Sequence, residues 1–168
     1  MAQTSFSLKY ETEFTERYAS QFYEGPVEKL LEEMRDAAGK AMRGVIQQFY
    51  ITAGVGRRTG NLYKSINAKK IRRQPGTIGV IAAAMGKGSR HRALIEYGTK
   101  GHLIRPREQS ILRIGLGFAQ LVEHPGSQAK PFVTPATGTA QNAGQQAADA
   151  VLGKYIERAN ALSSVEAA

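Results

Sequence analysis

The longest regular pattern of apolar positions begins after Gly25-Pro26 and continues to Phe49. Its members return every three or four positions, the period of one face of an α-helix. They are Val27, Leu30, Leu31, Met34, Ala38, Ala41, Val45 and Phe49. Proline suits the first turn of a helix, and Gly54 or Gly56 is suited to ending it. The pattern therefore predicts one helix of about 25 residues, roughly 37 Å long.

A second, narrower apolar stripe marks the end of the chain. From Pro135 or Thr137 to about residue 162 the sequence is rich in Ala and Gln, and the stripe consists of Ala147, Val151, Tyr155, Ile156 and Leu162. Because so thin a stripe buries little apolar surface, this helix needs a partner. Near the start of the chain, Tyr10, Phe14, Tyr18 and Phe22 recur four apart. That spacing predicts a short helix over residues 10–23.

Between the long helices the pattern changes to short, strand-like runs. Residues 66–73 and 77–82 flank Gln74-Pro75-Gly76, and Pro-Gly between two such runs predicts a β-hairpin. Residues 102–106, 109–114 and 118–123 also read as strands, whereas 91–97 predict a helical turn closing at Gly98. Thr59 is placed to cap a short helix that turns Leu62 and Ile66 inward.

These elements predict an α+β protein: a small, mostly antiparallel sheet flanked by a long N-terminal helix and a C-terminal helix. Its parts are an N-terminal arm with a short helix (1–25), a core domain (26–136) and a C-terminal helix and tail (137–168).

The stretch from His124 to Ala136 joins the strands to the last helix and holds three of the chain's six prolines. Each proline fixes φ and biases its predecessor towards extended geometry, so this backbone has few conformations available. We therefore expect Pro131-Phe132-Val133-x-Pro135 to dock Phe132 in the core and to direct the last helix, as a stiff joint.

Composition and charge narrow the class of protein. The 168 residues carry a net charge of +9 and include no cysteine, which excludes disulfides and thiolate metal sites. No apolar run reaches the roughly 20 residues of a membrane-spanning helix, and the N-terminus does not resemble a signal peptide. We expect a chain that is soluble and intracellular when made.

The charge is divided along the chain. Residues 1–36 hold eight acidic and four basic residues, whereas residues 55–107 hold thirteen basic residues and one acidic residue. Such a division favours contact with a polyanion or with acidic surfaces of neighbouring subunits.

The sequence lacks the usual signatures of catalysis. Gly54-x-Gly56-x-x-x-Gly60 does not have the dinucleotide-binding spacing, and Gly86-Lys87 lacks the earlier glycine of a phosphate-binding loop. There is no G-x-S-x-G motif. His91, His102 and His124 have no metal-ligand spacing. We therefore expect no enzymatic activity, no cofactor and no bound metal.

Three separated pieces of sequence form a recognisable series. They are Arg58-Thr59-Gly60-Asn61-Leu62-x-x-Ser65-Ile66, then Ile95-Glu96-Tyr97-Gly98-Thr99, then His124-Pro125-Gly126-x-x-Ala129-Lys130-Pro131-Phe132-Val133-x-Pro135-Ala136. Together, across roughly residues 26–160, this series resembles the tail-component or tail-completion family of lambda-like, long-tailed bacteriophages (siphophages). Residues 1–25 lie outside the shared pattern.

The resemblance implies a structural virion protein of the neck, where the tail joins the DNA-filled capsid. It implies a homo-oligomeric ring, commonly of six copies, that lets double-stranded DNA pass through its centre. The implied neighbours are other neck and tail proteins (the stopper, the tail terminator and the tail tube). Such a protein is assembled in the cytoplasm of the host bacterium and ends in the virion.

The resemblance also implies which residues form subunit or partner contacts. They are Arg58, Thr59, Gly60, Leu62, Glu96, Tyr97, Gly98, Pro131, Phe132 and Pro135. Glu96 is the only acidic residue between Asp36 and Glu108. We expect its helix to end at Gly98 and expose the carboxylate, which would pair with an arginine of its own subunit or the next.

A basic face is expected to meet either DNA or a neighbouring ring. Its members are Arg57, Lys69, Lys70, Arg72, Arg73, Lys87, Arg90 and Arg92. They could contact phosphates non-specifically in the lumen or dock against acidic surfaces of an adjoining ring. We favour docking, because DNA must slide out during ejection. The alternatives are a tail-terminator ring subunit, a head-side connector and a stand-alone, non-specific DNA-binding protein.

Overall fold

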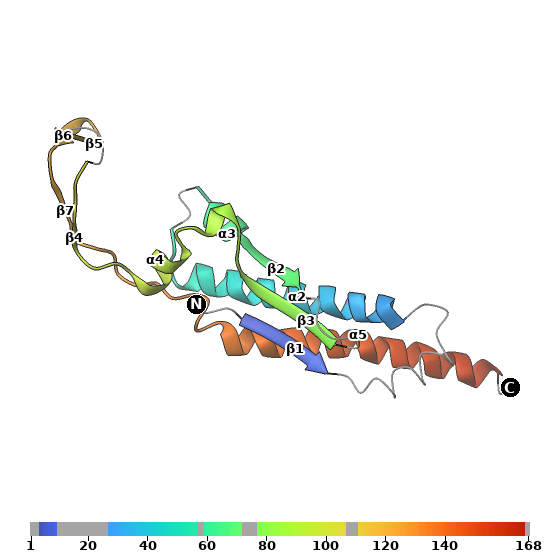
Figure 1. Cartoon of the computed structure of the whole chain (residues 1–168). Coiled ribbons are helices and arrows are strands. Elements are labelled where there is room, and N and C mark those ends of the chain that lie inside the picture. Colours follow the sequence, from blue (N-terminus) through green and yellow to red (C-terminus); the bar gives the residue numbers. More distant parts are fainter. Residues whose placement is uncertain (1–3, 10–26, 57–58, 72–76, 107–110, 167–168) are drawn as a thin grey trace.

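The computed structural model describes residues 4–9, 27–56, 59–71, 77–106 and 111–166 (Figure 1). Two long helices pack on one face of a three-stranded antiparallel sheet, and a narrow two-stranded arm stands away from one end of this body (Figure 1). The predicted α+β class, long N-terminal helix, small antiparallel sheet and C-terminal helix are confirmed.

The first long helix, α2 (Val27–Thr52), supplies most of the core. Most of its buried side chains recur four apart, at Leu30, Met34, Ala38, Met42, Ile46 and Tyr50, and Leu31 is buried beside this row. The predicted Ala41, Val45 and Phe49 are only partly buried. The helix was predicted correctly, and Leu30, Leu31, Met34 and Ala38 are buried as expected. Beyond Ala38 the buried row lies one position further along than expected. Since α2 contacts both the sheet and the other long helix, residues on both sides of this central row are also covered.

The C-terminal helix, α5 (Thr137–Glu166), runs antiparallel to α2 and packs along it (Figure 1). The partner that its thin apolar stripe requires is therefore α2. Its most buried row is made of small residues four apart, Ala140, Gly144 and Ala148, and Ala136 just before the helix continues the same spacing. Gly144 lies directly against Met42, so the two helices approach closely. Ile156, placed on the buried stripe by the sequence, is 37% exposed.

The sheet has the strand order β1-β3-β2. The predicted hairpin is confirmed as β2 (Ile66–Lys70) and β3 (Thr77–Ala84), paired antiparallel, while its turn lies outside the described residues. Val80, Ala82 and Ala84 of β3 are buried in the core. Strand β1 (Thr4–Lys9), which the sequence analysis did not predict, pairs with the other side of β3. The helix predicted over residues 10–23 also lies outside the described residues.

One short helix precedes the β2–β3 hairpin, and two further helical turns lead from the hairpin to the arm. They are α3 (Asn61–Lys64), the 3-10 turn η1 (Lys87–Ser89) and α4 (Arg92–Tyr97). Leu62 and Ile66 are buried as expected. Helix α3 follows Gly60, and the Asn61 N–H donates to Thr59 Oγ1 at 3.4 Å. Helix α4 ends at Gly98, which has a φ of 69°.

The remaining strands form the arm, defined here as residues 99–127. Strand β4 (His102–Ile104) pairs with β7 (Val122–His124) near the body, and β5 (Leu112–Ile114) pairs with β6 (Gly117–Ala119) further out (Figure 1). The single strand predicted over 118–123 is therefore divided between β6 and β7. The short strands were predicted, but not their position outside the main sheet.

Candidate assembly interface

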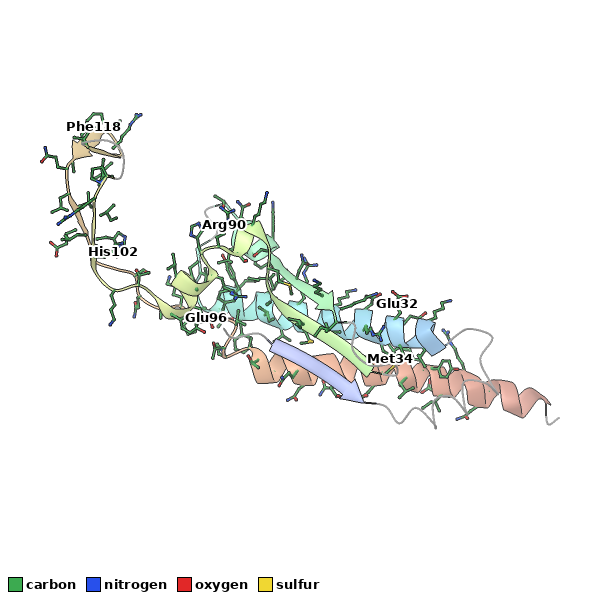
Figure 2. The ribbon with its side chains drawn as sticks, in the orientation of Figure 1. Glu32, Met34, Arg90, Glu96, His102 and Phe118 are labelled. Carbon is green, nitrogen blue, oxygen red and sulfur yellow. The ribbon has the colours of Figure 1, made fainter. Side chains whose placement is uncertain are left out.

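The carboxylate of Glu96 binds the backbone of the proline-rich stretch at the base of the arm. Its Oε1 accepts the Thr134 N–H at 2.8 Å, and its Oε2 accepts the N–H groups of Phe132 at 3.0 Å and Val133 at 3.2 Å. Glu96 lies where the arm meets the body (Figure 2), and it is only 4% exposed. The expectation of an exposed carboxylate paired with an arginine is therefore wrong. Backbone N–H groups, rather than an arginine side chain, stabilise the Glu96 carboxylate.

The pKa of Glu96 reflects two opposing effects. Burial raises the pKa because it disfavours the charged form. The backbone N–H groups of Thr134, Phe132 and Val133 favour the charged form, and they outweigh burial, so the pKa lies below its ordinary value. The carboxylate is consequently ionised at neutral pH.

The prolines explain why three consecutive donors are available here. Pro131 and Pro135 have no N–H groups and restrict the backbone on either side of residues 132–134. Phe132 between them is fully buried and packs edge-on against Tyr50, with ring centroids 5.2 Å apart. Helix α5 begins two residues after Pro135. The predicted docking of Phe132 in the core is confirmed.

Lys130 ties this stretch to two further elements. Its backbone N–H donates to the Ile95 carbonyl oxygen at 2.8 Å, and its Nζ donates to the Gly54 carbonyl oxygen at 2.9 Å. The end of α2, helix α4 and the proline-rich stretch are thus bonded together at one point. We call residues 95–99 and 124–136 the joint. Lys130 was part of the third sequence motif but was not chosen as a site residue.

The base of the arm is closed by two glycines and a pair of facing residues. Thr99 and Ser127 exchange both backbone hydrogen bonds, at 2.9 and 3.0 Å, and their hydroxyl oxygens lie 3.0 Å apart. Gly98 and Gly126 have φ values of 69° and 90°. A Cβ on Gly98 would meet the Ser127 carbonyl oxygen, and one on Gly126 would meet that of Thr99. Glycine is required at both positions.

Replacing Gly126 with alanine should destabilise the arm by about 2 kcal/mol, because the new Cβ meets backbone atoms and φ is unfavourable. Thermal unfolding followed by circular dichroism measures the loss. Gly153→Ala is the control: nothing lies within 4 Å of the added atom, and alanine favours the helix by up to about 1 kcal/mol. An unfolding temperature for Gly126→Ala equal to that of the unmodified chain would contradict this description of the base.

The arm exposes large apolar side chains to solvent. Of the ten exposed large hydrophobic residues in the described part of the chain, six lie on the arm: Leu103, Ile111, Ile114, Leu116, Phe118 and Leu121. Leu116 is fully exposed and Phe118 is 68% exposed, and Phe118 lies at the outer end of the arm (Figure 2). An isolated two-stranded ribbon is marginally stable in water, and clustered exposed apolar side chains mark interaction surfaces.

The predicted basic face is only partly available to a partner. Lys70 Nζ lies 2.7 Å from Glu32 Oε1 and 3.1 Å from Asp36 Oδ1, and its hydrogen bonds to Glu32 and then Asp36 raise its pKa. Arg92 donates to the Ala84 carbonyl oxygen at 3.0 Å. Lys69, Lys87 and Arg90 are exposed.

The other predicted site residues differ in their exposure to solvent. Tyr97, Thr59, Pro131 and Pro135 are exposed, whereas Leu62 is buried. The arginines Arg57, Arg58, Arg72 and Arg73 lie outside the described residues. The structure therefore brings the second and third sequence motifs into direct contact through Glu96.

The sequence analysis did not single out the tip of the arm. The signal was present, because apolar residues and glycines alternate in Ile114-Gly115-Leu116-Gly117-Phe118. Such a run fits a turn that leaves large apolar groups uncovered, but it reads equally well as a core strand. Only the position of the arm outside the body distinguishes the two interpretations (Figure 1).

Within the described part of the chain, no cluster of three or more His, Asp or Glu side chains could hold a metal ion. His102 and His124 are stacked across the arm, with ring centroids 5.1 Å apart. Among the same residues, none of the helices has the length and apolar character needed to cross a bilayer. The chain matches no protein-family model, and comparison with curated proteins and with solved structures finds no significant relative.

Proposed function

We propose that this chain is a structural subunit of the neck of a long-tailed bacteriophage. In this role copies of the chain assemble into a ring that completes the tail, joins it to the DNA-filled capsid and lets double-stranded DNA pass. A tail-terminator ring uses the same kind of subunit and differs in the neighbour that it contacts.

The observation that carries the proposal is an arm whose base is hydrogen-bonded to the body and whose large apolar side chains are exposed. Glu96 bonds the base of the arm to the proline-rich stretch, and Phe132 anchors that stretch in the core. The six apolar residues of the arm gain stability only when they are covered. Because the arm stands away from its own body (Figure 1), we infer that a neighbouring molecule covers them.

A second copy of the chain is the covering molecule that we propose. An arm that contacts a different surface on the next copy makes a head-to-tail contact, and such contacts generate rings when the rotation closes. A rigid joint supports this reading, because a small angular error in each subunit accumulates around a ring. The resemblance of the three sequence motifs to tail-completion proteins points to the same assembly.

The test is the mass of the purified protein in solution, measured by light scattering with and without duplex DNA. We expect a discrete oligomer without DNA, about six times the 18.3 kDa of one chain. The double variant Leu116→Ser, Phe118→Ser should remain folded but shift to single chains, because it removes apolar groups from the arm. Ile156→Ser, at an exposed apolar residue of α5, is the matched control and should leave the oligomer unchanged.

The rival interpretation gives a different result in the same experiment. A stand-alone DNA-binding protein would be a single chain in the absence of DNA and would bind duplex tightly with or without the arm substitutions. That outcome would contradict the proposal that the chain forms a ring.

A further inference from the structure

A pocket of about 240 Å³ lies between α2 and β2, remote from the joint and the arm. One wall is the stretch of α2 from Arg35 to Arg43, and the other is β2, the edge strand of the sheet. A Cβ on Gly39 would lie 3.0 Å from Ala68 Cβ, so the helix and the strand touch beneath the pocket. The pocket is therefore formed by two packed elements of the main body of the fold.

The lining of the pocket is strongly basic. It includes five cationic residues, Arg35, Lys40, Arg43, Lys69 and Lys70, and a single carboxylate, that of Asp36. Lys70 lies within ion-pair distance of both Asp36 and Glu32, so its one charge is shared between two exposed carboxylates. The other four cationic residues of the lining keep the pocket net positive. Lys40, Arg43 and Lys69 are exposed and face the pocket from its two walls.

We propose that this pocket binds a phosphate group. Cations on both walls suit a tetrahedral anion, whose oxygens point in several directions, better than a planar carboxylate with two oxygens. Arginine forks and lysine ammonium groups are the usual partners of phosphate oxygens. At about 30 Å³ for each water molecule, the volume corresponds to roughly eight waters, enough for one phosphate group and its attached ester.

The phosphate can come from a nucleic-acid backbone or from a small phosphorylated solute. A duplex is far too large to enter, so it would present one backbone phosphate at a time to the pocket. The inference extends the proposed function by assigning a phosphate contact to α2 and β2, including Lys69 and Lys70 of the predicted basic face, and it does not depend on the formation of a ring.

The test compares two matched double variants of the full chain. Lys40→Ala, Arg43→Ala removes two cations from the pocket, and Lys154→Ala, Arg158→Ala removes two exposed cations from α5. Binding of a short DNA duplex is measured by fluorescence anisotropy over a range of salt concentrations, and binding of inorganic phosphate by NMR titration. For the pocket variant we expect duplex affinity to fall about tenfold and the salt slope to decrease by about 2.

A selective loss in the pocket variant supports the proposal with either probe. Loss of duplex binding identifies the nucleic-acid backbone as the source, and loss of phosphate binding alone identifies a small solute. Equal losses in the two variants, or no loss in the pocket variant, overturn it. Melting curves confirm that both variants fold. Their oligomeric mass, recorded on the same samples, separates this result from any failure of the ring proposal.

Discussion

Replacing Glu96 with glutamine is expected to lower the free energy of unfolding by about 3 kcal/mol at neutral pH. Glutamine keeps one oxygen acceptor but places an NH₂ group where the carboxylate has its second oxygen. At least one of the N–H groups of residues 132–134 then loses its acceptor in a buried site, and the remaining bonds lose the negative charge. Urea unfolding followed by circular dichroism measures the difference. Glu96→Ala removes all three acceptor contacts and should cost about 3–5 kcal/mol.

The pH dependence of this difference identifies the charge as its cause. The pKa of folded Glu96 lies below its ordinary value of 4.5, so its contribution to stability is complete above that value. The contribution is lost as the pH falls through the lowered pKa. Glutamine does not titrate, so the gap between the unmodified chain and Glu96→Gln should close in acid.

The matched control is Glu157→Gln, at an exposed position on α5. It should change the free energy of unfolding by less than about 0.5 kcal/mol at any pH. A Glu96→Gln variant that unfolds like this control at neutral pH would show that the joint is not held by the carboxylate.

Replacing Phe132 with alanine is expected to lower the free energy of unfolding by about 3–5 kcal/mol. The side chain is fully buried and contacts Tyr50 of α2, so its removal leaves a cavity where the joint meets the core. Domains typically have a free energy of unfolding of only about 5–15 kcal/mol. The variant should therefore be only marginally stable. The substitution should also loosen the orientation of the arm and of α5, because both begin at the joint.

Phe118→Ala provides a control of the same chemistry on the arm. Phe118 is 68% exposed, so its truncation should change the stability of the single chain by less than about 1 kcal/mol. It should instead weaken the oligomer. The proposal requires two different effects. Phe132→Ala should lower the stability of the fold, whereas Phe118→Ala should weaken assembly. Equal effects on stability would contradict the assignment of Phe118 to a contact surface.

The regular elements of the fold could be predicted from the sequence, because the apolar residues in each element recur at one regular spacing. Helix α2 was placed nearly to its ends, and the hairpin of β2 and β3 was located by its Pro-Gly turn. The buried row in the second half of α2 was misplaced by one position, because α2 is covered on two sides and its apolar band is wide. Strand β1 was missed, although Ser and apolar residues alternate in Ser5-Phe6-Ser7-Leu8.

The joint could be predicted only in part. The prolines and Phe132 indicated a stiff, anchored connection, and the structure confirms the anchor. The partner of Glu96 was not predictable by matching opposite charges, because its donors are backbone N–H groups that every residue except proline carries. Their arrangement arises only when Pro131 and Pro135 fix the chain between them. The position of the arm outside the body was not predictable either. Short strands with alternating apolar residues have the same sequence pattern whether or not other elements cover them.

The central claim is that copies of this chain close into a ring through the arm. The most direct measurement is electron microscopy of the purified protein in the absence of DNA, with particles viewed down their axis. The account predicts closed rings of uniform copy number around an open centre, absent from the Leu116→Ser, Phe118→Ser variant. Single 18.3 kDa particles, or open filaments of varying length, would contradict it.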